Sequence, residues 1–499
     1  MELLIVVAAL FLLGLLANRY GHDSRDRSSS DEERLSAQGF AWDSQAGPHA
    51  AAPRVPARPT ALALLSRMLY CGWRHHWKGA RLMKTPVLEH GTALVAAWLP
   101  RRGSLPRLLA VVGLVLSGGT ACAALGNAPA APNGPIRIGM VVSLTGNYAA
   151  LGTNQKLGAQ QVVDNLNANN GINGRKIELD IVDDSSDPNQ TVVQFNKVIS
   201  DGVVAVLGPS GSTAGLAIKP IANAKQIPTI SLATADEQVV PVTPYMWMTP
   251  PLASHVANVC VEFAASQGKT KLAMLYDAGN AFALAGHEAA MKALATSGMQ
   301  LVDDQAFETK QTNFAPQLAK ITEARPDVLL VLAVGAPAVV ITKAWADLNT
   351  GIPLMMSAAQ ASTLYVQPSG AAAEGVFVEA TMGVVGESLP TSNKFKKLMD
   401  ELATPFKQVN NYYPPQFAWD GMVATSLLID AIMRKGASSD QIRDGLDSIS
   451  LDTPQGHYTF TPQKHWGMPD SGNVMSVIKD GRFVPAPGVT QEQLAAAGQ

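Results

Sequence analysis

The chain has few cysteines and no motif typical of a metal site. Three of its 499 residues are cysteines. Cys71 and Cys122 precede the segment that we predict to fold, so Cys260 has no partner for a disulfide within the fold. The nine histidines include the pair His75 and His76, but no HExxH or CxxC arrangement is present. We therefore predict no structural disulfide, no metal and no cofactor.

Charge is also scarce. Charged residues make up 16% of the sequence and the formal net charge is -2. This balance predicts no affinity for nucleic acid and no acidic partner. A hydrophobic share of 47% is typical of a globular protein, and 499 residues are too many for one ordinary domain.

A hydrophobic segment opens the chain. Residues 3–17 are apolar throughout, yet fifteen helical residues span only about 23 Å against a bilayer core of about 30 Å. We interpret residues 1–105 as this segment followed by a mostly disordered region, which is polar at first and then rich in alanine and proline. Met83 is an alternative start that leaves out residues 1–82.

A better-formed export signal follows at residues 106–123. Arginines, the apolar run LLAVVGLVL and the small residues SGGTACA come in the order of a signal peptide, with Ala121 and Ala123 as the recognition pair for cleavage. Cleavage before Cys122, giving a lipid anchor, is the alternative. Residues 124–135 form an Ala/Pro/Asn-rich linker. We therefore predict export to the periplasm, with Cys122 or the first hydrophobic segment as possible membrane anchors.

The stretch from 203 to 236 combines two strand ends with hydroxyl-bearing loops. The apolar run 203–207 is typical of a buried strand, and Gly208 and Pro209 end it. The loop that follows is rich in serine, and Ser212 or Thr213 is a plausible N-cap of the next helix. A second strand, 228–231, leads to another polar loop. Open α/β sheets bind ligands in a crevice between such loops.

Strands and helices alternate along the rest of the chain. A first strand is expected at 136–144, and a proline-rich stretch at 241–251 separates two series of alternating elements. This alternation predicts an α/β fold with parallel, right-handed crossovers. The strands expected after the boundary are 271–276, 301–307, 328–334, 352–356 and 375–380.

Two motifs carry a family resemblance. The stretch VVAVLGPSGSTAGLAIKPIANAKQIPTISLATAD and the spaced pattern G-x-x-x-x-x-G-A…N…G-I-N-G-R…D-D-x-x-D-P resemble type I periplasmic binding proteins of ABC transporters, in particular the branched-chain amino-acid receptors. The resemblance implies two Rossmann-like lobes joined by a hinge that the chain crosses three times. One lobe is expected at 136–253 plus 382–452 and the other at 254–381 plus 453–485, with a tail at 486–499.

The resemblance also implies a binding site. The residues matching its carboxylate and amino-group contacts are Ser212, Thr234 and the carbonyl of Leu232. Its aromatic positions are matched by Leu151 with Tyr148 nearby, Phe282, Gly335 and Phe417. The family's acid for the ammonium group is missing, because the corresponding loop reads SAAQA at 357–361. An unpaired ammonium in a closed cleft costs several kcal/mol, so the sequence favours a carboxylate or amide ligand with an apolar body.

The expected function is solute capture for an ABC importer. The partners are then a small molecule and a membrane permease, and we expect a monomer. A sensory domain of the same fold is the alternative. An α/β hydrolase is disfavoured because GPSGS departs from G-x-S-x-G, and a dehydrogenase because the loop lacks G-x-G-x-x-G.

Overall fold

The computed structural model describes residues 134–499. The predicted N-terminal region, the export signal with Cys122 and most of the linker lie outside the described residues. Cys260 is a buried free thiol. Across residues 134–499, no helix combines the length and the apolar character needed to cross a membrane.

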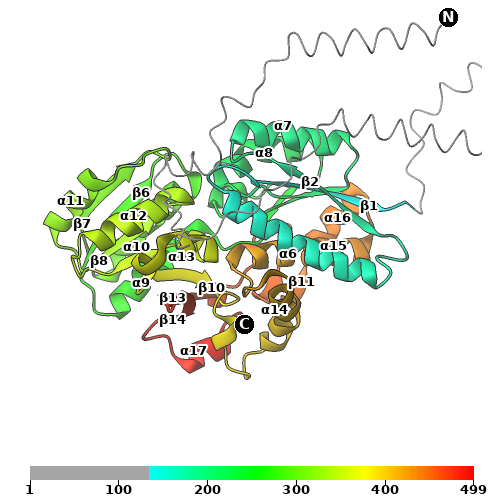
Figure 1. Cartoon of the computed structure of the whole chain (residues 1–499). Coiled ribbons are helices and arrows are strands. Elements are labelled where there is room, and N and C mark those ends of the chain that lie inside the picture. Colours follow the sequence, from blue (N-terminus) through cyan, green and yellow to red (C-terminus); the bar gives the residue numbers. More distant parts are fainter. Residues whose placement is uncertain (1–133) are drawn as a thin grey trace, which may run out of the picture. The chain divides into compact units, whose positions relative to one another are not determined.

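The first sheet is fully parallel and has the strand order β2-β1-β3-β4-β5. Helices cover both of its faces, with α6, α15 and α16 packed on one face and α7 and α8 on the other (Figure 1). We call this layer structure the first lobe. Its strands are β1 (Ile136–Val142), β2 (Ile177–Asp183), β3 (Ala205–Leu207), β4 (Thr229–Ser231) and β5 (Met246–Met248). Its helices are α6 (Ala149–Ala168), α7 (Pro188–Ser200), α8 (Ser212–Lys225), α15 (Gln416–Lys435) and α16 (Ser439–Leu446).

The second sheet has the order β14-β13-β10-β9-β8-β6-β7. The pairs among β6 to β10 are parallel, and β13 runs antiparallel to both of its neighbours, β10 and β14. With its helices it forms the second lobe, where α9 and α10 cover one face and α11 to α13 the other. The strands are β6 (Lys271–Asp277), β7 (Gln300–Phe307), β8 (Val328–Leu332), β9 (Leu354–Met356), β10 (Phe377–Thr381), β13 (Asn473–Lys479) and β14 (Arg482–Pro485). The helices are α9 (Ala253–Ser266), α10 (Ala281–Ser297), α11 (Ala315–Ala324), α12 (Ala336–Asp347) and α13 (Thr363–Ser369).

These strands confirm the α/β fold and the parallel alternation predicted from the sequence. Each expected strand is present, with ends that differ by one to a few residues. A short antiparallel pair, β11 (Ser450–Thr453) and β12 (Gly456–Thr459), was not foreseen. Short 3-10 helices occur at Asp236–Gln238, Ala358–Gln360, Gly370–Ala373, Gly386–Ser388 and Asp470–Gly472.

The last passage of the chain between the lobes comes later than expected. Residues from 453 onward were assigned to the second lobe. Tyr458, Phe460 and Met468 instead pack in the core of the first lobe, because these apolar side chains cluster with those of its sheet and of α15 and α16. The second sheet resumes only at Asn473, where β13 begins.

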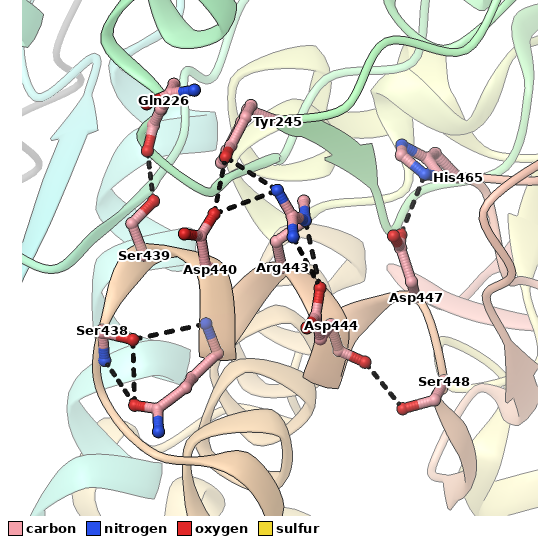
Figure 2. A network of polar contacts seen from close by, with 11 residues as sticks. Gln226, Tyr245, Ser438, Ser439, Asp440, Arg443, Asp444, Asp447, Ser448 and His465 are labelled. Carbon is pink, nitrogen blue, oxygen red and sulfur yellow. Dashed lines mark hydrogen bonds and ion pairs between the residues drawn. The ribbon is translucent and has the colours of Figure 1, made fainter.

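Helix α16 makes polar contacts with the loop before β5 and with His465 of the late segment (Figure 2). Tyr245 donates its hydroxyl proton to Asp440 at 3.0 Å and accepts a hydrogen bond from Arg443. Nε2 of the buried His465 lies 3.0 Å from Oδ1 of Asp447, and the imidazole stacks on Trp247 of β5. The contacts of His465 therefore tie the late segment to the first lobe.

The expected tail is part of the fold. Helix α17 (Gln491–Ala496) buries Leu494 in an apolar cluster with α14 (Lys396–Asn410) and α15. Asn393 donates hydrogen bonds to the carbonyls of Leu494 and Ala497 at 2.8 and 3.0 Å. The last residues are therefore held by both packing and hydrogen bonds.

Candidate functional site

A small cavity lies where loops from both sheets meet. Its volume is about 40 Å³, which limits its contents to a small molecule. The walls come from the head of α6, the loops after β3, β4, β5, β6, β8 and β9, and the head of α15. The lining residues are Tyr148, Leu151, Ser210, Gly211, Ser212, Leu232, Ala233, Thr234, Pro250, Pro251, Asn280, Phe282, Val334, Ala358, Ala359, Gln416, Phe417 and Asp420.

Ser212 and Thr234 form a hydroxyl-bearing part of this wall. Helix α8 begins at Ser212 with Gly211 as its N-cap, and no side chain caps it, so the expected capping role of Ser212 or Thr213 is wrong. The reason is that Ser212 Oγ instead accepts the N–H groups of Thr234 and Ala235, both at 3.2 Å. Its own proton is left free to donate, which suits an anionic oxygen of a ligand.

Ser210 and Leu232 belong to a buried hydrogen-bond chain. Ser210 donates to Oε1 of Gln155 at 2.6 Å and accepts the N–H of Ser143. Gln155 in turn donates from Nε2 to the carbonyl of Leu232 at 3.0 Å. The carbonyl oxygen of Leu232 keeps a second lone pair, so it can accept one further hydrogen bond. This chain fixes the two loops relative to α6.

The apolar wall joins residues that lie far apart in the sequence. Leu151, Phe282 and Phe417 are buried in one cluster, with Val334 and the partly buried Tyr148 beside them. These side chains come from both lobes, and each was matched to an aromatic position of the resembled family or lies beside one. The structure thus brings seven of the eight candidate residues to one cavity wall.

Gly335 is the exception. It is not among the cavity-lining residues, and its backbone has φ 73°, a left-handed conformation that favours glycine. A Cβ atom at this position would lie 2.3 Å from the carbonyl oxygen of Asn147. The position therefore serves a close contact between the lobes, and it has no side chain to offer a ligand.

Two hydrogen bonds also join the lobes at the rim. Asn280, the N-cap of α10, donates from Nδ2 to the hydroxyl oxygen of Tyr148 at 2.9 Å. Ala281 donates its N–H to Oγ1 of Thr213 at 3.3 Å. Burial raises the pKa of Tyr148, so its hydroxyl is neutral. The structure therefore has the lobes in contact around the cavity.

Sequence reasoning missed a carboxylate in the wall. Asp420 lies one turn after Gln416 on α15, is 2% exposed and lines the cavity. Gln416 donates from Nε2 to its Oδ1 at 2.9 Å. Helix α15 is buried on nearly all sides, and the run of apolar residues around Asp420 was the available signal. The loop after β9 contributes Ala358 and Ala359 and, as its sequence dictates, no acid.

Two lobes of parallel α/β structure enclosing a small cavity define the class of a two-lobed solute-binding protein. The family described as periplasmic binding protein matches residues 135–482. Because this match covers well over half of the chain, the chain belongs to the periplasmic binding protein family.

Individual relatives agree with this assignment. The Leu/Ile/Val-binding protein BraC3 of Rhizobium johnstonii is 40% identical over 125 residues, which are 25% of this chain and 30% of that protein. The matched stretch thus spans less than a third of this relative. The solved LivJ of Streptococcus pneumoniae with isoleucine has a TM-score of 0.63 at 22% identity, covering 70% of this chain and 97% of that one.

A second solved neighbour carries a different ligand. A solute-binding protein of R. palustris in complex with benzoate has a TM-score of 0.62 at 20% identity, covering 70% of this chain and 95% of that one. At these identities the likeness shows the shared fold alone.

Proposed function

We propose that this protein is the extracytoplasmic solute-binding component of an ABC importer, which captures a small carboxylate-bearing molecule between its lobes and delivers it to a membrane permease. The observation that carries the proposal is the cavity enclosed by loops of both sheets. A ligand that contacts both lobes stabilises the closed form by its differential binding free energy, which a permease can recognise.

The cavity wall favours a ligand with one anionic end and an apolar body. The free protons of Ser212 and Thr234 are hydrogen-bond donors for a carboxylate, and the cluster of Leu151, Phe282 and Phe417 suits an aliphatic or aromatic group. Two of the solved neighbours are complexes with isoleucine and with benzoate. Both ligands combine a carboxylate with an apolar body.

The same wall argues against covalent catalysis. A serine nucleophile needs an adjacent general base. Among the described residues that line the cavity, the carboxylate of Asp420 is a candidate base, but its hydrogen-bond donors are Gln416 and Gln455 and neither serine hydroxyl donates to it. Ser212 Oγ accepts two backbone N–H groups, and the hydroxyl of Ser210 is held by Gln155. These contacts suit binding without turnover.

Thermal shift of the purified full-length chain tests the proposal. The panel contains amino acids, aromatic acids, hydroxy acids and short amides. We expect at least one carboxylate to raise the melting temperature and to be recovered unchanged. If no acid or amide raises the melting temperature, the proposed role in solute uptake is wrong. Export is tested separately, by fusing residues 83–130 to a reporter that is active only outside the cytoplasm.

A further inference from the structure

The carboxylate of Asp420 is held by one oxygen and is free at the other. Oδ1 accepts hydrogen bonds from Nε2 of Gln416 at 2.9 Å and from Nε2 of Gln455 at 3.3 Å. Within residues 134–499, no group donates a hydrogen bond to Oδ2. Asp420 lines the cavity, so a ligand there can supply this missing donor.

Thr381, the last residue of β10, holds both glutamines in place. Oε1 of Gln416 accepts the backbone N–H and the hydroxyl of Thr381, at 3.0 and 2.8 Å. Thr381 ends β10 of the second lobe, and its hydroxyl oxygen also accepts Nε2 of Gln455 at 3.1 Å. Segments from both lobes therefore orient the Asp420 carboxylate before a ligand arrives.

The cavity contains no positive charge to balance this carboxylate. Of the described residues that line it, only Tyr148 and Asp420 are ionisable, and none is lysine, arginine or histidine. A ligand with a lone carboxylate would place a second negative charge in the same enclosed space. A ligand that also carries an ammonium group would bring the missing counter-charge.

We propose that Asp420 binds the ammonium group of a zwitterionic ligand whose carboxylate lies at Ser212 and Thr234. This inference rests on the proposed function and specifies its substrate class. It replaces the sequence-based expectation that the site lacks a partner for an ammonium group. The acid sits on α15, at the hinge, and not in the loop after β9.

The protonation state of Asp420 supplies a measurable signature. Burial raises the pKa of Asp420 to about 7, and the hydrogen bonds from Gln455 and Gln416 offset part of this shift. The neighbouring titratable groups are Tyr458 on β12 and Tyr148 at the head of α6. Burial raises the pKa of both hydroxyls, so both are uncharged at neutral pH. Gln416, Gln455 and Thr381 do not titrate.

Calorimetry on the full-length protein with matched probes tests the assignment. The probes are leucine, its 2-hydroxy analogue and 4-methylpentanoate, together with phenylalanine, phenyllactate and 3-phenylpropanoate. We expect the ammonium-bearing member of the better-fitting series to bind most tightly. Near pH 7 its binding should release protons, because the ammonium group favours the ionised Asp420. A simple carboxylate should take up protons instead.

The variant Asp420→Asn keeps the acceptor oxygen for both glutamines and removes the charge. Losing one charge-assisted hydrogen bond should weaken binding of the ammonium probe roughly tenfold to hundredfold. Affinity for the simple carboxylate should stay unchanged or improve, and proton release should vanish. Asp430→Asn, on the same helix and outside the cavity, is the control for the substitution itself. Glu379→Gln is the control for removing another buried acid.

The outcomes separate the two proposals. If the simple carboxylate binds the wild type as tightly as the amino acid does, or if Asp420→Asn leaves the amino acid's affinity unchanged, the role of Asp420 is wrong while solute binding stands. Proton release that persists in Asp420→Asn and disappears in Glu379→Gln also overturns it. If neither these six probes nor any acid or amide of the thermal-shift panel binds, the proposed function fails and this inference fails with it.

Discussion

Asp420 and Glu379 are two buried carboxylic acids in different surroundings. Asp420 on α15 lines the cavity and accepts two amide hydrogen bonds. Glu379 on β10 is outside the cavity wall, opposite Met475 of β13, and neither of its oxygens has a hydrogen bond of normal geometry. Burial raises the pKa of Glu379 to about 8, although the nearby N–H of Ala358 offsets a small part. Burial also raises the pKa of Asp420, from the lower ordinary value of an aspartate to about 7.

The two acids differ in their access to the cavity and in the hydrogen-bond donors around them. Two donors keep Asp420 near the point of ionisation at neutral pH, where a ligand's charge can tip the balance. Glu379 has no such donors and is mainly a neutral acid at pH 7. Its charge also adds to the burial that raises the pKa of the Cys260 thiol. We therefore expect Asp420 to act in binding and Glu379 to affect stability alone.

The largest expected effect is on the stability of Glu379→Gln. The pKa of the Glu379 carboxyl is near 4.5 in the unfolded chain and near 8 in the folded protein. Between these pH values the folded state holds more protons, so the free energy of unfolding of the wild type falls as the pH rises. The variant loses this dependence. By the usual conversion it should be more stable than the wild type at pH 9 by on the order of 5 kcal/mol.

Urea denaturation at several pH values measures this difference. At pH 4 the two proteins should have similar unfolding free energies, because Glu379 is then neutral in both states of the wild type. Equal pH dependence in the wild type and the variant would show that Glu379 is ionised in the folded protein and paired. Glu379 would then not be a neutral buried acid, and its contrast with Asp420 would be wrong.

The second effect is on the stability of Asp420→Asn without ligand. The pKa of the Asp420 carboxyl is near 3.8 in the unfolded chain and near 7 in the folded protein. Stability of the wild type should therefore fall between these pH values, and the variant should be the more stable protein at pH 8, by about 4 kcal/mol at most. Unlike Glu379→Gln, this variant should also lose ligand affinity. A stability gain without a loss of affinity would make the two acids equivalent.

The sequence predicted the strands and helices of the fold better than the position of the buried acid in the cavity wall. The run 203–207 and the loop after it showed β3 and the start of α8, because apolar runs and small polar residues are local signals. For Asp420 the signal was weaker, an acid within a run of apolar residues. Its burial depends on α15 being enclosed by both lobes, and its donor Gln455 comes from a segment 35 residues away. Contacts of this kind arise only from the tertiary fold.

Gly335 and Ser212 show the same limit at smaller scale. A motif match placed Gly335 in the site, but the close approach of Asn147 gives it a role between the lobes. Ser212 resembled an N-cap because it precedes a helical pattern. Its hydroxyl instead bonds the loop after β4, a contact across 22 residues. In both cases the contact that the residue makes in the fold differs from the one that the sequence suggested.

A third, smaller effect concerns Ser212→Ala at the hydroxyl end of the cavity. If Ser212 donates its proton to the ligand's carboxylate, its loss should weaken binding by about 1.5 to 3 kcal/mol. The variant also loses the acceptor for the N–H groups of Thr234 and Ala235. The melting temperature without ligand and the dissociation constant are measured on the same protein. A lower melting temperature with unchanged affinity would assign Ser212 to holding the loop alone.

The smallest effect is expected for Asp430→Asn, the partly exposed acid of the same helix. Asp430 accepts a hydrogen bond from Nε of Arg434 at 2.7 Å, and both side chains reach solvent. Ion pairs of this spacing contribute about 0.3 to 0.5 kcal/mol. The variant should lose no more than this in urea denaturation and should bind ligand like the wild type. Since the same Asp→Asn change at 420 is expected to stabilise the free protein and weaken binding, opposite signs at the two positions would show that surroundings set the effect. A loss of affinity in Asp430→Asn would mean that any change on α15 weakens binding. The loss in Asp420→Asn would then not show that Asp420 contacts the ligand.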